Sequence, residues 1–307
     1  MTIGRDSPLP MNQPLLTSAA RFAEVHANQH GVATTPIPGL AIVRETTPSA
    51  LQHAINRPLV ALVLQGSKRV TMGPSSFEFG AGESLLITAD VPTVSQITRA
   101  NQATPYLSVV VELDTAIISD LVAEIGAVPF AAGRPVRVDR TEAEVADAAL
   151  RLIRLLDRPA TIPILQAQLL RELHFWLLSG QHGGAIRVLG VPGGHAHRIA
   201  RAVNLIRTEF AAPLPVERLA ETAGMGLSSF HEHFRAQTSM TPLQFQKQLR
   251  LIEARRLMLS LGETISNAAY AVGYESVPQF TREYGRLFGL SPAREIRMTR
   301  QRLSSAA

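Results

Sequence analysis

Polar side chains of types that read DNA bases stand at helical spacing near the C-terminal end of this 307-residue chain. Gln279, Thr281 and Arg282 lie within four positions, among aromatic residues that would face a core. An arginine can fork to guanine, a glutamine to adenine, and a threonine methyl group can contact thymine. This segment therefore predicts a helix that reads base edges in a major groove of DNA.

The segment is the second copy of a repeated pattern. Ala220 and Gly224 of the first copy match Ala269 and Gly273 of the second, at an offset of 49. Past the turn the offset is 50, and the matched pairs are Phe230 with Phe280, Phe234 with Tyr284, and Pro242 with Pro292. A small alanine lets two helices cross closely, and aromatic residues four apart seat the second helix on the first. Two helix-turn-helix units with two recognition helices indicate a DNA-binding function.

Each recognition helix has one face predicted to be buried and one face left for DNA. The residues expected in the core are Leu227, Phe230, Phe234, Phe280, Tyr284 and Phe288. The residues expected to contact DNA are Ser228, Ser229, His231, Glu232 and Arg235 in the first helix, and Pro278, Gln279, Thr281, Arg282 and Arg286 in the second.

Glu232 is an unusual residue beside phosphates. It could accept a hydrogen bond from cytosine N4 or hold Arg235 one turn away, and we favour the structural role. His231 and His233 do not form a metal pair, because residues two apart on a helix do not face each other. No metal site and no cofactor is expected.

Charged residues are unevenly distributed along the chain. Residues 195–307 hold 15 Lys and Arg against 9 Asp and Glu, whereas residues 1–194 hold 15 against 16. A basic module beside a near-neutral one is typical of a nucleic-acid binder with a separate second domain. Arg250, Arg255 and Arg256, between the two units, fit either phosphate contacts or a solvated face. The chain has no cysteine and no run of 18 apolar residues, which favours a reducing cytoplasm and no membrane span.

The pattern along the chain predicts an α+β protein of two domains. Short β-like runs separated by turns between residues 39 and 113 predict a small sandwich or barrel, with helices before and after it. Thr141 and Glu144 form a capping-box pattern for one of these helices. The expected parts are a disordered start (1–15), a β-barrel domain with flanking helices (16–180), a Gly-rich linker (181–194), and an all-α domain (195–300) with helix-turn-helix units at 216–238 and 265–288, followed by a polar tail.

The last 110 residues or so closely resemble the AraC/XylS family of transcription regulators. The resemblance rests on Ser228-Ser229-Phe230-His231, Thr241-Pro242-Leu243-Gln244-Phe245, Glu253-Ala254-Arg255-Arg256-Leu257, Val272-Gly273-Tyr274-Glu275-Ser276 and Arg286-Leu287-Phe288-Gly289. It implies that two recognition helices enter successive major-groove segments about 34 Å apart, one turn of the duplex. Many relatives carry a basic residue where this chain has Glu232, so their base specificity does not transfer to that position.

The N-terminal half resembles the sensor domain of one subgroup of this family. That resemblance rests on Pro58-Leu59-Val60, Val63-Leu64-Gln65-Gly66-Ser67-Lys68, Tyr106-Leu107 and Arg171-Glu172-Leu173-His174. It implies a cupin-like β-barrel that binds a small effector, mediates dimerisation, or does both. The residues proposed for effector contact are Arg44, His53, Lys68 and Trp176.

The resulting hypothesis is a cytoplasmic DNA-binding regulator, more an activator than a repressor. Its expected partners are double-stranded promoter DNA, RNA polymerase, a small effector and a second copy in a homodimer. One alternative is a constitutive regulator whose barrel only dimerises. The other is a cupin-type enzyme, which is disfavoured because the strand region holds only His53 and no His-x-His pair.

Overall fold

The computed structural model describes residues 13–28, 30–72, 75–126, 136–191 and 193–306. The chain divides into two compact units, Met1–His197 and Arg198–Ala307. The expected disordered start falls largely on residues 1–12, which lie outside the described residues.

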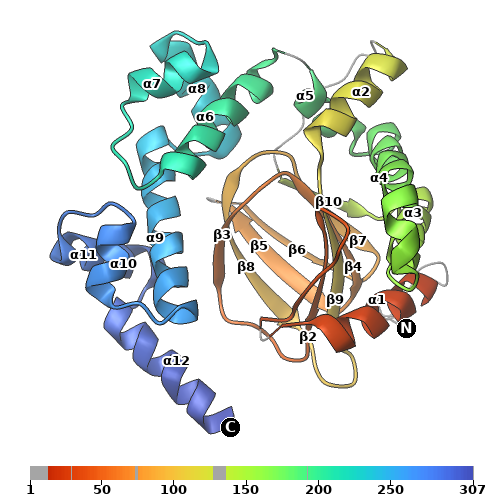
Figure 1. Cartoon of the computed structure of the whole chain (residues 1–307), viewed down its shortest axis with the longest axis horizontal. Helices are drawn as coiled ribbons and strands as arrows, with labels where there is room; N and C mark the ends of the chain where they lie inside the picture. The colour runs from red at the N-terminus through yellow and green to blue at the C-terminus, as the bar shows by residue number, and fades with distance from the viewer. Residues whose placement is uncertain (1–12, 29, 73–74, 127–135, 192, 307) are drawn as a thin grey trace, which may run out of the picture. The chain divides into compact units, whose positions relative to one another are not determined.

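The first unit is built on two antiparallel sheets that face each other (Figure 1). One sheet has the order β1-β2-β9-β4-β7-β10, and the other has the order β3-β8-β5-β6. The strands are β1 (Val32–Thr34), β2 (Leu40–Glu45), β3 (Gln52–Asn56), β4 (Leu59–Gln65), β5 (Ser67–Met72), β6 (Ser75–Gly80), β7 (Glu83–Ile87), β8 (Val91–Arg99), β9 (Tyr106–Glu112) and β10 (Val136–Arg140).

Alternation along β4 and β9 divides the larger sheet into two apolar faces. Val60, Leu62 and Val109 point to one face and are fully buried. They share a core with the helices of this unit, and that core includes Leu152 and Leu177. The other face belongs to a second core, between the two sheets. The fold is therefore α+β, with a barrel-like pair of sheets and helices on one side.

The helices of this unit are α1 (Gln13–His26), α2 (Thr115–Ile125), α3 (Ala143–Leu155), α4 (Ile162–Ser179) and α5 (Gly183–Gly190), with a 3₁₀ turn η2 (Pro159–Thr161) before α4. Figure 1 shows α1, α3 and α4 beside the sheet that contains β4 and β9. Asp114 caps α2 by accepting from the backbone N–H groups of Ala116 and Ile117.

Two local expectations for this unit are wrong. Thr141 does not cap α3: the N-cap is Glu142, with no side-chain cap hydrogen bond. Residues 181–194 are not a linker throughout, because they contain α5, in which Ala185 and Ile186 are buried. Glycines at both ends of α5 concealed it, although its centre is apolar.

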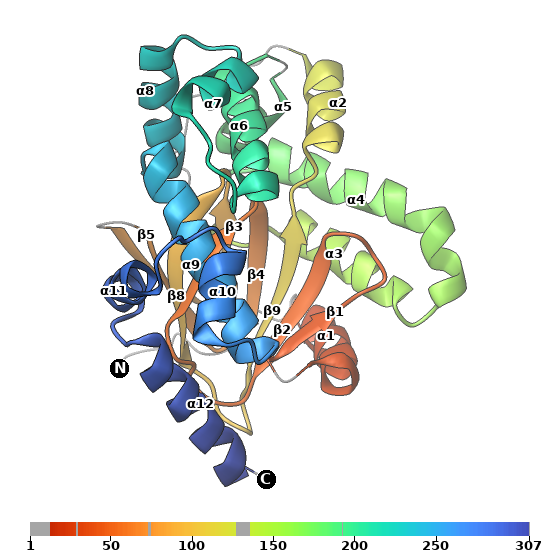
Figure 2. The same ribbon diagram turned by 60° about the vertical axis from the view of Figure 1, so that its left-hand side comes forward.

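The second unit is all-helical. Its helices are α6 (His195–Glu209), α7 (Val216–Ala223), α8 (Leu227–Thr238), α9 (Pro242–Ser260), α10 (Ile265–Ala271), α11 (Val277–Phe288) and α12 (Pro292–Ala306). Both views show α9 running from the α7–α8 pair to the α10–α11 pair (Figures 1 and 2). The expected polar tail is mostly helical, since α12 continues to Ala306. Within the described residues, no helix is long and apolar enough to cross a membrane.

Candidate DNA-binding surface

The first helix-turn-helix consists of α7 and α8. Its turn is at Gly224, whose φ of 63° is left-handed and suits glycine. Phe230 and Phe234 of α8 are fully buried, with ring centroids 5.4 Å apart. Phe234 meets Phe245 of α9 edge to face at 5.7 Å, which seats the recognition helix on the helix that follows it.

The second helix-turn-helix consists of α10 and α11. Gly273 has a φ of 85°, and any Cβ atom there would clash with the carbonyl oxygen of Ala211. Phe280 and Tyr284 are fully buried, as are their counterparts Phe230 and Phe234 in the first helix-turn-helix. The Tyr284 hydroxyl donates to Glu295 of α12 at 2.7 Å, which satisfies the polar end of a buried ring. The repeated aromatic pattern thus builds two similar helix pairs.

Helix α9 connects the two helix-turn-helix pairs. A capping box fixes its start: the Thr241 hydroxyl accepts from the Gln244 backbone N–H, and the Gln244 side chain accepts from the Thr241 N–H. With 19 residues, α9 is about 28 Å long at ~1.5 Å per residue. Figure 2 shows α8 and α11 near its opposite ends. A length near one turn of duplex DNA suits two helices that enter successive major-groove segments.

Arg250 of α9 serves the fold rather than a solvated or phosphate-binding face. Arg250 donates to the carbonyl oxygens of Phe210, Ala211, Ala212 and Gly273, at 2.6 to 3.2 Å. Burial lowers the pKa of this guanidinium.

The other two arginines of α9 are paired with acidic groups. Arg255 pairs with Glu295 at 2.6 Å and lies over the Phe288 ring. Arg256 pairs with Glu253 at 2.7 Å. The sequence allowed two interpretations of these arginines, phosphate contacts or a solvated face. Arg250 and Arg255 fit neither of them.

The outward face of α8 carries most of the residues expected there. Ser228, His231, Glu232 and Arg235 are exposed, and Ser229 is half-buried. The expectation that Leu227 is buried is wrong, since 44% of its surface is exposed. Leu227 is the first residue of α8, one turn before Phe230.

Glu232 does not hold Arg235. Both residues are described, and no ion pair or hydrogen bond joins them. The structural role favoured from their spacing is therefore absent. At the offset of 50, Glu232 of α8 corresponds to Arg282 of α11, so the two recognition helices present opposite charges at matching positions.

The outward face of α11 is more basic than that of α8. Pro278, Gln279, Arg282 and Arg286 are exposed, and Thr281 is half-buried. Within the described residues, Arg282 and Arg286 make no hydrogen bond or ion pair. Gln279 is not fully free, because its amide donates to Glu283 at 3.4 Å, a long contact.

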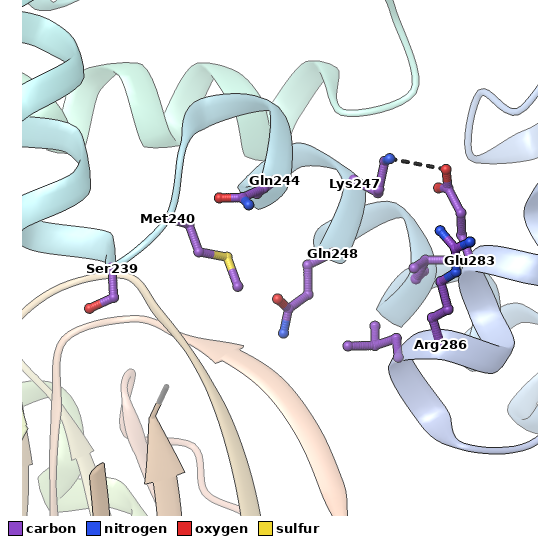
Figure 3. Close-up of a pocket in the computed structure, with 9 residues that line it drawn as sticks. Ser239, Met240, Gln244, Lys247, Gln248, Glu283 and Arg286 are labelled. Atoms are coloured by element: carbon purple, nitrogen blue, oxygen red, sulfur yellow. Dashed lines mark hydrogen bonds and ion pairs between the residues drawn. The ribbon is translucent and has the colours of Figure 1, made fainter. Parts of the chain in front are cut away.

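Glu283 links α11 to its neighbours at the edge of a groove of about 410 Å³ between α9 and α11. Figure 3 shows its carboxylate joined to Lys247 of α9, at 3.0 Å, with Arg286 beside it. The Tyr274 hydroxyl donates to the other carboxylate oxygen at 2.7 Å. Burial alone would raise the pKa of Glu283, but hydrogen bonds from Tyr274, Lys247 and Gln279 outweigh it and lower the pKa. This anchored carboxylate fixes the position of α11 relative to α9.

Helix α12 adds a basic stripe that the sequence argument missed. Arg294, Arg297 and Arg300 are exposed at three-residue spacing, with no ion pair within the part of the chain described. That spacing after Pro292 was the available signal in the sequence.

The structure does not bring the four effector candidates together. Arg44 points to the helix side of its sheet, 3.8 Å from Glu24 of α1. Trp176 lies on α4 and donates to Glu172. His53 lies on the face of its sheet opposite to Lys68, by strand register. Only Lys68 faces the space between the sheets, across from Phe79 and Ile97 in the register. No group of three potential metal ligands occurs among the residues described.

Comparison with known proteins gives the same two-part division. Residues 36–185 match the family described as AraC-type transcriptional regulator N-terminus, and residues 219–298 match a helix-turn-helix domain family. The transcriptional activator RhaS of Enterobacter sp. is 30% identical over 130 residues, which cover 42% of this chain and 46% of RhaS. The activator RhaR of Pectobacterium atrosepticum is 31% identical over 98 residues, 32% of this chain and 34% of RhaR. The chain thus matches less than half the length of these curated relatives.

Among solved structures, two forms of ToxT from Vibrio cholerae share the fold. The apo form gives a TM-score of 0.57 at 10% identity, over 85% of this chain and 98% of ToxT. A form with a bound unsaturated fatty acid gives 0.56 at 10% identity, over 84% and 93%. The fold and the two domain matches define a two-domain protein, in which an AraC-type transcriptional regulator N-terminus precedes a helix-turn-helix domain. The chain belongs to the AraC/XylS family, with an AraC-type N-terminal domain.

Proposed function

We propose that this protein is a sequence-specific DNA-binding transcription activator whose N-terminal barrel responds to a small molecule. The observation that carries the DNA-binding part is the pair of exposed polar faces on α8 and α11, joined by one helix. Arg235, Arg282 and Arg286 on those faces have no partner within the described residues, whereas Arg250, Arg255 and Arg256 are engaged in the fold. Unpaired arginines on a recognition face suit guanine and phosphate.

The roles of the two recognition helices differ in this proposal. Arg282 of α11 reads a guanine, and Arg286 contacts a guanine or a phosphate. On α8, Ser228, His231 and Arg235 make the contacts, and Glu232 accepts from a cytosine N4 amino group. Arg294, Arg297 and Arg300 of α12 contact phosphates, which position the protein without reading sequence.

The remaining partners follow from the regulator role. An activator acts in the cytoplasm on promoter DNA and recruits RNA polymerase. Ile164, Leu165 and Phe175 of α4 are exposed apolar residues, which favours this helix as the surface of a homodimer. The competing function is a constitutive regulator in which the barrel serves only for dimerisation.

The experiment is a binding titration of the purified protein on its own upstream intergenic DNA and on a scrambled duplex, over a salt series. Preference for the upstream DNA near physiological salt supports the proposal. Equal binding to both duplexes, with an affinity that falls steeply on added salt, would show only electrostatic, sequence-independent binding. Absence of binding to either duplex at low salt would contradict it.

A further inference from the structure

Lys68 is the one cationic side chain of β5 that points between the two sheets. In the register it lies opposite Phe79 of β6 and Ile97 of β8, which are buried. Its neighbour Arg69 points to the other face and pairs with Glu78 at 2.8 Å. Placing a lysine among apolar residues costs free energy unless an ion pair or a hydrogen bond compensates its charge.

Among the residues that the structure describes, no group compensates this charge. Within the described residues, the Lys68 ammonium makes no hydrogen bond or ion pair. Burial is the only cause that lowers its pKa, with no contribution from a carboxylate. Glu45, on the larger sheet, has its pKa raised by burial and is influenced by His30, not by Lys68. The structure therefore keeps an unpaired cation on an apolar inner face.

Solvent reaches the inner face of the larger sheet. Val43, Leu59, Val110 and Val138 belong to the core between the sheets, yet they remain partly exposed. Their neighbours on the helix side, such as Val60, are fully covered. Apolar surface that stays partly open between two sheets is suited to an apolar ligand.

A polar group accompanies Lys68 at the same end of the barrel. Tyr106 belongs to the same inner cluster as Val70, Phe79 and Ile97, and its backbone packs on Gly66, two residues before Lys68. Burial raises the pKa of Tyr106 to about 12, although a hydrogen bond with Ser108 opposes this effect. The phenol is therefore a neutral hydroxyl at ordinary pH, able to donate its one O–H hydrogen bond to an anion while it accepts from Ser108.

We propose that Lys68 is the anion-binding residue of the barrel and that the effector is a monocarboxylate with an apolar body. The carboxylate pairs with the Lys68 ammonium, and the apolar body covers the inner faces of β2, β4 and β9. This inference rests on the proposed role of the barrel as the sensor, and it names the chemical class of the ligand.

The test is calorimetric titration of the full-length protein with two acids, phenylacetate and decanoate, and with their neutral amides. The wild type is expected to bind at least one acid more tightly than its amide. Lys68→Met should remove this preference, a loss of about tenfold or more for a charged hydrogen bond. Arg69→Met, one residue along on the other face, should keep it. No preference for either acid in the wild type, or a preference that survives in Lys68→Met, overturns the proposal.

Thermal unfolding without ligand gives a second readout. An unpaired charge that is half-buried among apolar residues destabilises the fold, so Lys68→Met should melt at a higher temperature than the wild type. A lower melting temperature would mean that Lys68 serves packing, and it would contradict the proposal. DNA binding is measured on the same samples. Loss of acid binding with intact DNA binding separates this inference from the regulator function.

Discussion

At the residue scale, the cations of the helical unit divide into two groups. The cations of α9 bind other groups of the same chain. Arg250 alone donates to four backbone carbonyls from the α6–α7 and α10–α11 connections. Arg282 and Arg286 on α11 are exposed and, in the described part of the chain, unpaired. A guanidinium already held by carbonyls is not available to DNA, so the α11 arginines are the ones expected to bind it.

Arg282→Ala should weaken binding to the specific site by about 1–3 kcal/mol, because a forked contact to guanine is lost. Binding to a scrambled duplex should change much less. The measurement is a pair of titrations at one salt concentration. Arg256→Ala is the matched control, since Arg256 is exposed but paired with Glu253 on α9. Equal losses on both duplexes would show that Arg282 contacts only phosphate.

Glu232→Gln should raise affinity for scrambled DNA, since an exposed carboxylate without an ion pair repels phosphates. It should also reduce discrimination between specific and scrambled DNA by about 1 kcal/mol or more, if the carboxylate reads cytosine. The ratio of the two dissociation constants measures this directly. An unchanged ratio would rule out base reading by Glu232.

At the element scale, the aromatic residues of each helix-turn-helix set the position of its recognition helix. In the first helix-turn-helix, Phe230 is fully buried, with its ring centroid 5.4 Å from that of Phe234. Phe230→Ala should lower the free energy of unfolding by roughly 3–5 kcal/mol through the cavity it leaves. Chemical denaturation checks this value. Leu227→Ala, three residues earlier and exposed, should have little effect, and a comparable loss there would contradict the assigned core face.

His174 connects α4 to the start of α2. Its Nε2 accepts from the Asp114 N–H at 2.9 Å, so the proton is on Nδ1, which faces the Leu170 carbonyl at 2.7 Å. Burial lowers the pKa of His174 below its ordinary 6.5, and Leu170 and Asp114 oppose this effect only in part.

The direction of this shift predicts how stability depends on pH. The unfolded chain takes up a proton at a higher pH than the folded chain, so stability is complete above pH 6.5 and is lost as the pH falls below it. His174→Gln should flatten the fall in stability between about pH 7 and about pH 5. Part of the slope should remain, because burial also lowers the pKa of His182. Identical slopes in wild type and variant would contradict this account.

The elements that the sequence predicts well are those with local signals. The repeat of Ala, Gly and aromatic residues predicts two helix-turn-helix units, and the short apolar run of residues 59–65 predicts β4. β10 could not be predicted because it pairs with β7 some 50 residues earlier and is mostly charged. β3 is likewise polar, and β8 contains a proline.

The candidate site was predictable to the extent that its residues lie on one helix. The outward positions of α8 and α11 follow from the 3.6-residue period and the aromatic anchors. The roles of Arg250 and Glu283 could not be predicted, because their partners come from segments distant in sequence. Lys68 could be named as a candidate, but only the strand register shows which face it occupies.

At the scale of the whole molecule, the chain joins a barrel, in which Lys68 points between the sheets, to a helical unit with two recognition faces. Each part has its own core. Sensing and DNA binding can therefore be tested separately in one full-length protein. The positive charge lies in the part that carries the recognition helices, as electrostatic attraction to DNA requires.

The central claim is that both recognition helices of one chain read DNA. The most direct measurement is methylation interference on duplexes selected from random sequence by the wild-type protein. We predict two contacted major-groove segments on one face of the duplex, about one turn apart. Arg282→Ala should remove interference in only one of them. A single contacted segment, or the loss of both in Arg282→Ala, would contradict this account.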